Sequence, residues 1–167
     1  MSAPNPNTVS QPVRVVVVMD PISEIKPAKD TTLAMLLAAQ QRGWELWYAE
    51  QRDLWLRDGV PLARLAPLTV RNDLQDWYQL GESQARGLSE FDVILMRKDP
   101  PFDMEYIYTT YILERAEEAG VLVVNRPQGL RDMNEKVYTA WFPEFCAPTL
   151  VTRDMHAMGE FASEFGR

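Results

Sequence analysis

Two apolar runs predict strands that are covered on both faces of a sheet. Residues 14–19 place four valines and a methionine after Arg14, and residues 91–96 are apolar except for Asp92. Runs without polar alternation are typical of parallel sheets, in which helices cover both faces. Both segments end near prolines, Pro21 and Pro100, because proline lacks an amide donor and disfavours helix at the residue before it.

Other segments extend this pattern. Aromatic and polar residues alternate over residues 44–49, and residues 121–124 form another apolar run. Helical spacing of leucines after Asp30 or Thr31 predicts a helix that ends at Gly43, and Asp103 begins a second predicted helix that runs to about Ala119. Strands that alternate with helices favour right-handed crossovers. We therefore predict an α/β fold with a mainly parallel, Rossmann-like sheet flanked by helices.

A hairpin interrupts the alternation. The dipeptide Asp58-Gly59 readily adopts the positive φ angles of a two-residue turn, so residues 54–57 and 60–65 are expected to pair. Residues 68–70 are expected to add a strand, and the pattern of residues 77–87 predicts only a polar connection.

The C-terminal forty residues contain too few elements for a core of their own. We predict helices over residues 127–131, 134–142 and 154–165, and a strand over residues 149–151. Elements of this number and length cannot bury an independent core. The predicted domains are therefore a disordered extension at residues 1–13, a first domain at 14–125, and the beginning of a second at 126–167.

Composition narrows the functional classes. Seventeen basic and 24 acidic residues give a net charge of −7, so we expect no nucleic-acid partner. Residues 1–13 resemble neither a signal peptide nor a membrane span, and we expect no membrane association. Cys146, the single cysteine, cannot form an intramolecular disulfide, which fits a reducing cytoplasm. With His156 the single histidine, an imidazole metal cluster is excluded.

Charged residues follow both apolar strands. In open parallel sheets, ligands bind beyond the carboxyl ends of the strands. Asp20 follows the first strand, and Arg97, Lys98 and Asp99 follow the other. Arg97 offers a planar fork for a carboxylate, and the two aspartates can accept from an ammonium group, so together they suit a zwitterionic peptide. The alternative is that Arg97 pairs with Asp99 for structural reasons and Lys98 is solvated.

Lys136 is a further candidate. It lies near the start of the helix expected over residues 134–142, where an ammonium and local amides can both meet phosphate oxygens. The alternative is a lysine on a solvated helix face. The chain contains neither a dinucleotide fingerprint nor a P-loop motif.

These residues lie in segments that resemble the prokaryotic glutathione synthetases, a family of ATP-grasp ligases. The similarity covers roughly residues 14–153. The segments that carry it are 18–22, 33–43, 92–103, 108–118 and 124–142, among them the run Met-Arg-Lys-Asp-Pro-Pro-Phe at 96–102. The resemblance implies a pre-ATP-grasp domain to about Asn125, followed by the opening of an ATP-grasp domain.

The resemblance also implies a reaction. In this family ATP phosphorylates the cysteinyl carboxylate of γ-glutamylcysteine, glycine attacks the acyl phosphate, and Mg²⁺ balances the phosphate charge. Lys136 matches the family's first ATP-contacting lysine. Asp20, Arg97, Lys98 and Asp99 lie in motifs that border the substrate cleft. The family suggests a homo-oligomer, a tetramer. It also continues for about as many residues again, with further ATP and Mg²⁺ ligands, so the chain alone is expected to be inactive.

Two other functions stay open at this point. One is a non-catalytic module that binds a small peptide or another subunit. The second is a different ATP-grasp ligase, such as one that joins D-alanines, although such an enzyme is not expected to share residues 96–102. The reading frame distinguishes the first from a ligase, because a continuation with acidic metal ligands supports the ligase and a stop after Arg167 supports the module.

Overall fold

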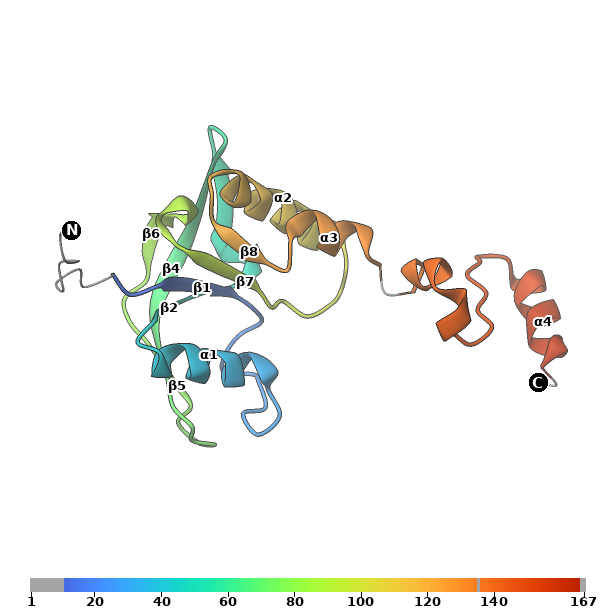
Figure 1. Ribbon diagram of the computed structural model, residues 1–167, viewed down its shortest axis with the longest axis horizontal. Coiled ribbons are helices and arrows are strands. Elements are labelled where there is room, and N and C mark those ends of the chain that lie inside the picture. Colours follow the sequence, from blue (N-terminus) through green and yellow to red (C-terminus); the bar gives the residue numbers. More distant parts are fainter. Residues whose placement is uncertain (1–10, 135, 166–167) are drawn as a thin grey trace, which may run out of the picture. The chain divides into compact units, whose positions relative to one another are not determined.

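Four expected strands lie in parallel in the computed structural model, which describes residues 11–134 and 136–165. They are β1 (Arg14–Val18), β2 (Glu45–Ala49), β7 (Val93–Met96) and β8 (Leu122–Val124), and their order across the sheet is β2-β1-β7-β8 (Figure 1). The strand pairs β1–β2, β1–β7 and β7–β8 are all parallel. The carboxyl ends of these strands therefore meet at one edge of the sheet.

The other strands pair in the antiparallel sense. They are β3 (Leu54–Arg57), β4 (Val60–Val70), β5 (Tyr78–Leu80) and β6 (Gln84–Gly87). The first half of β4 pairs with β3 and β6, and its second half pairs with β2 and β5. The described chain thus forms one eight-stranded sheet with both kinds of pairing. A mixed α/β fold is confirmed, and the antiparallel half is larger than expected.

The hairpin between β3 and β4 forms as predicted. Asp58 and Gly59 have φ angles of 51° and 78°, the left-handed conformation that a two-residue turn of this kind needs. Residues 68–70 are not a separate strand but the end of β4. The expected polar connection at residues 77–87 contains β5 and β6.

Two helices cover the sheet, one on each side (Figure 1). They are α1 (Thr31–Gln41) and α2 (Met104–Glu118). The Asp30 carboxylate accepts from the Leu33 amide over 2.6 Å, and Asp103 caps α2 in the same way. Beneath α1, Val15 and Val17 of β1 pack with Leu36 in one buried cluster. Alternate residues of β1 are buried on the opposite face, because side chains alternate along a strand.

The described residues separate into two units, the first ending at Pro127 and the second beginning at Gln128. Residues 1–10, which make up most of the predicted disordered extension, lie outside the described residues, as do Glu135, Gly166 and Arg167.

The second unit differs from the prediction in two places. Helices α3 (Pro127–Asp132) and α4 (Met155–Glu164) form as expected. Over residues 134–142, however, the described chain makes turns and a 3₁₀ segment, because the Asn134 side chain accepts from the amides of Lys136 and Val137. Residues 149–151 are not a strand, since the described part of this unit contains no other strand with which to pair.

Candidate functional site

The loops that follow β1 and β7 lie next to each other at the carboxyl edge of the parallel strands. The Arg97 amide donates to the Val18 carbonyl over 2.7 Å, so the pairing of the two strands continues one residue beyond β7. Parallel pairing thereby brings Asp20 close to residues 97–99, as the sequence predicted.

Asp20 joins the two loops. One carboxylate oxygen lies 2.9 Å from the Lys98 ammonium, and the other accepts from the Asp99 amide over 3.0 Å. The Lys98 ammonium also donates to the Asp99 carbonyl over 2.5 Å. The Lys98 side chain is only 17% exposed. Lys98 is therefore not the solvated side chain of the alternative interpretation. Its contacts with Asp20 and Asp99 show that Asp20 and Lys98 hold the two loops together.

Arg97 is held by the first turn of α1. Its Nε donates to Thr32 Oγ1 over 3.0 Å, and its Nη2 donates to Thr31 Oγ1 over 3.1 Å. Thr32 is 4% exposed. No salt bridge joins Arg97 to Asp99 in the described structure. The structural pair that was the alternative interpretation of these two residues is therefore not formed. The guanidinium is oriented instead by neutral hydroxyl groups.

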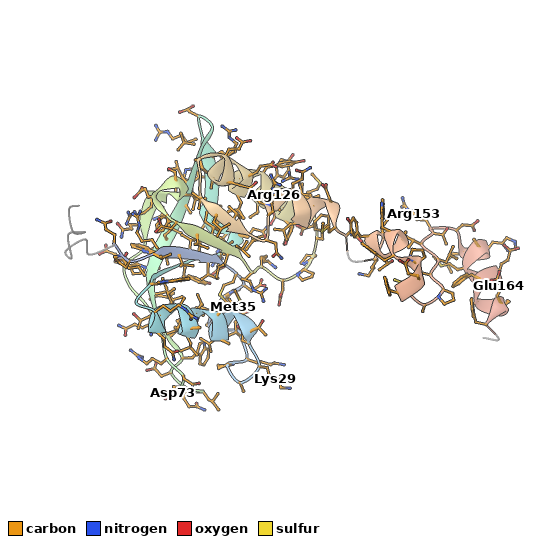
Figure 2. All side chains as sticks on the ribbon, in the orientation of Figure 1. Lys29, Met35, Asp73, Arg126, Arg153 and Glu164 are labelled. Atoms are coloured by element: carbon orange, nitrogen blue, oxygen red, sulfur yellow. The ribbon has the colours of Figure 1, made fainter. Side chains whose placement is uncertain are left out.

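Two adjoining hollows lie between these loops and the start of α1, and we call them together the β1–β7 cleft. Their volumes are about 340 and 240 Å³. Both are lined by Asp20, Ile25, Lys29, Asp30 and Asp99; the larger also by Pro21, Glu24 and Lys26, and the smaller by Met19, Thr31, Thr32 and Arg97. Lys29 lies in the loop just before α1 (Figure 2). Cationic and anionic groups therefore face the same small space, which suits a ligand that carries both charges.

The loop that follows β1 is fixed by contacts that the sequence did not predict. Ile22 is 2% exposed; its amide donates to the Tyr48 hydroxyl over 3.3 Å, and its carbonyl accepts from Trp77 Nε1 over 3.0 Å. The Tyr48 hydroxyl donates in turn to Glu50. Burial is the largest of the effects that raise the pKa of Tyr48 far above its ordinary value, so the phenol stays neutral and keeps this donor.

Lys136 lies in the second unit. It is exposed, and it borders a pocket of about 510 Å³ whose other lining residues are Val137, Thr139, Ala140, Pro143, Cys146, Ala147, Pro148, Thr149 and Val151. Its carbonyl accepts from the Thr139 hydroxyl over 2.6 Å. The helix start at which Lys136 was expected is a turn. Cys146 is half-buried in the same pocket.

Metal and membrane features are limited in the described residues. His156 is exposed on α4 and lies 3.3 Å from Glu160. No group of three or more histidine, cysteine, aspartate or glutamate side chains is arranged there to bind a metal ion. Among the helices of the same residues, none has both the length and the apolar character needed to cross a membrane.

Three of the residues predicted from the sequence, Asp20, Arg97 and Asp99, line the cleft, and Lys98 lies beside it in contact with Asp20. Other residues of the cleft were not predicted. The sequence pattern assigns Asp30 and Thr31 only as helix caps, although the start of a helix that follows a parallel strand is itself part of the ligand edge. The position of Thr31 and Thr32 at such a helix start was therefore the one sequence feature that could have predicted them as cleft residues. Nothing in the local pattern distinguishes Lys29, because a lysine in a polar loop is ordinarily solvated.

Comparison with known proteins shows the family to which the chain is similar. Residues 13–131 match the family described as prokaryotic glutathione synthetase, N-terminal domain. The chain is 56% identical to the glutathione synthetase of Shewanella oneidensis, 57% to that of Photorhabdus laumondii and 57% to that of Pseudomonas putida. These matches cover 89%, 92% and 91% of the chain, but only 47%, 49% and 48% of the relatives. The chain thus spans about half the length of the curated relatives it matches.

Proposed function

Because the chain belongs to the prokaryotic glutathione synthetase family, we propose that it is the N-terminal part of an ATP-dependent ligase that joins γ-glutamylcysteine to glycine. The family match spans residues 13–131, which contain every residue of the β1–β7 cleft. That overlap is the observation that carries the proposal. The product of the ligation is glutathione, with ADP and phosphate.

In this proposal the β1–β7 cleft binds γ-glutamylcysteine. The dipeptide carries two carboxylates and an ammonium group, and the cleft offers Arg97 and Lys29 for the former and Asp99 for the latter. Asp20 and Lys98 neutralise each other over 2.9 Å, so their part is to hold the two loops at a fixed separation. Binding by preorganised groups reduces the conformational entropy lost on association.

ATP and Mg²⁺ complete the proposed reaction. When bound, they supply a phosphoryl group to activate the cysteinyl carboxylate, and charge to stabilise it. Lys136 fits a contact with ATP phosphate, because its exposed side chain borders a 510 Å³ pocket. The described residues do not fit a Mg²⁺ site, since no three or more of their histidine, cysteine, aspartate or glutamate side chains are arranged to bind a metal ion. The proposal therefore assigns the Mg²⁺ ligands to the half of the relatives' length that this chain does not span.

The domain organisation follows from the same proposal. Residues 14–125 form the Rossmann-like, pre-ATP-grasp domain, and residues 126–167 open the ATP-grasp domain. The enzyme works in the cytoplasm as a homo-oligomer, for which the family suggests a tetramer. The chain alone forms no glutathione, because it spans half the length of its relatives.

Isothermal titration of the chain with γ-glutamylcysteine tests the binding role. Arg97→Ala is expected to weaken binding by about 2 kcal/mol, the lower end of the range for removing one partner of a buried charge pair, because the cleft is partly open. Arg57→Ala is the matched control, since Arg57 lies on the exposed hairpin with its side chain 80% accessible. Equal affinities of Arg97→Ala and the parent chain contradict the role of the cleft.

The ligase function has a separate test. A complete enzyme built on this sequence should release ADP only when γ-glutamylcysteine and glycine are both present. ADP release with D-alanine instead indicates the other kind of ligase. Dipeptide binding without any ADP release in the complete protein indicates the non-catalytic module.

A further inference from the structure

The Arg97 guanidinium is held along one edge only. Thr32 accepts from its Nε and Thr31 from its Nη2, over 3.0 and 3.1 Å. An arginine side chain has five N–H donors in a planar fork. The two donors on Nη1 meet no acceptor among the described residues, so this edge of the guanidinium is available to a ligand.

The Thr32 hydroxyl is placed to control that orientation. It belongs to a residue that is 4% exposed, so water competes little for it. It also stands in the first turn of α1, whose start is fixed by the Asp30 cap. The backbone of Arg97 is fixed independently by its bond to Val18. The side chain is therefore held at both ends, from two elements that are more than 60 residues apart in the sequence.

We propose that Thr31 and Thr32 are positioning residues that orient Arg97 toward a carboxylate of γ-glutamylcysteine. The ligand's identity rests on the proposed function, whereas the orientation of Arg97 rests on the hydrogen bonds. Arginine in the smaller hollow could otherwise adopt many rotamers, and a fixed planar fork binds a carboxylate with less loss of side-chain freedom. In this arrangement the threonines act through Arg97.

The test compares Thr32→Val, which removes the hydroxyl at nearly constant shape, with Thr32→Ser, which retains it. Calorimetry with γ-glutamylcysteine should give a Kd about tenfold weaker for Thr32→Val, the effect of one hydrogen bond to a charged group. Thr32→Ser should stay within about twofold of the parent chain, and Thr31→Val should weaken binding in the same direction. Thr69→Val, an exposed change on β4, is the control and should leave the Kd unchanged.

A second measurement separates this inference from the proposed ligand. The Arg97 Nε–H proton should exchange with water faster in Thr32→Val than in the parent chain, without any ligand. Unchanged exchange, or a Kd for Thr32→Ser as weak as that for Thr32→Val, overturns the positioning role. Faster exchange in a chain that does not bind γ-glutamylcysteine supports the positioning role and refutes the proposed ligand. Because Thr31 is exposed, Thr31→Val provides a variant that should fold even if Thr32→Val does not.

Discussion

Replacing Asp20 with asparagine should loosen the two loops of the cleft. The change keeps an oxygen that can accept from the Asp99 amide, but it removes the charge that lies 2.9 Å from the Lys98 ammonium. At an effective dielectric constant of about 20, two unit charges at that distance attract by roughly 6 kcal/mol before desolvation and side-chain entropy are counted. Exposed ion pairs contribute only about 0.2 to 1 kcal/mol to stability. Removing one partner of a buried pair lowers stability by about 3 to 5 kcal/mol.

The Asp20–Lys98 pair lies between these limits, because its side chains are 38% and 17% exposed. We therefore expect Asp20→Asn to lower the free energy of unfolding by about 1 to 3 kcal/mol. Urea denaturation followed by tryptophan fluorescence measures this change. Glu82→Gln is the matched control, since it removes the same charge from an exposed loop residue and should change stability by less than about 0.5 kcal/mol.

A double-mutant cycle isolates the pair itself. Lys98→Met removes the other charge, and the combined variant should be less destabilised than the sum of the single changes, because neither partner is then left alone. An unfolding free energy of Asp20→Asn within about 0.3 kcal/mol of the control would show that the loops are held by other contacts. Additive single effects would refute the pairing argument even if each variant is unstable.

Other changes probe the core, the loop that follows β1 and the second unit. Leu113→Ala removes a fully buried side chain of α2 and should cost about 2 to 5 kcal/mol in urea denaturation. Burial raises the pKa of Tyr48, so the neutral phenol contributes its full stability below the ordinary tyrosine pKa of about 10, and this contribution falls as the pH rises above that value. Thermal melts of Tyr48→Phe should therefore show a smaller loss of stability at alkaline pH than those of the parent chain. In a complete enzyme, Lys136→Ala should raise the Michaelis constant for ATP, whereas unchanged steady-state kinetics would rule out that role. The chain alone should give no ADP release with γ-glutamylcysteine, glycine and Mg-ATP, and amide exchange should be faster over residues 136–165 than in the β1–β7 pair.

Local patterns predicted the parallel strands of the first unit well, and they did so most clearly for β1, which is buried on both faces. A run such as residues 14–19 has one stable placement, inside a parallel sheet, and proline then ends it. The same reasoning failed at residues 149–151, where a β-branched segment has no strand beside it within the described second unit. Strand formation depends on a partner, and the sequence of one segment does not show whether that partner exists.

The failure at residues 134–142 has a different cause. Helical spacing is present, but a short isolated helix gains little from its own hydrogen bonds, and Asn134 offers its side chain to the same amides. Tertiary packing usually decides whether the helix or the turn forms. Here large apolar side chains of the second unit remain accessible, Trp141 at 65% and Phe145 at 83%, so little packing supports the helix.

The site shows the same division between local and distant causes. Asp20 and Arg97 could be predicted because each follows its own apolar strand, and parallel pairing brings the ends of such strands together. The partners of Arg97 could not be predicted, because Thr31 and Thr32 are 66 and 65 residues away in the sequence and contact Arg97 only in the folded chain. A capping sequence explains why a helix begins at Thr31, but not what its first turn faces. The direction of a binding side chain is therefore decided by tertiary contacts, even where its presence at the ligand edge is decided by the strand before it.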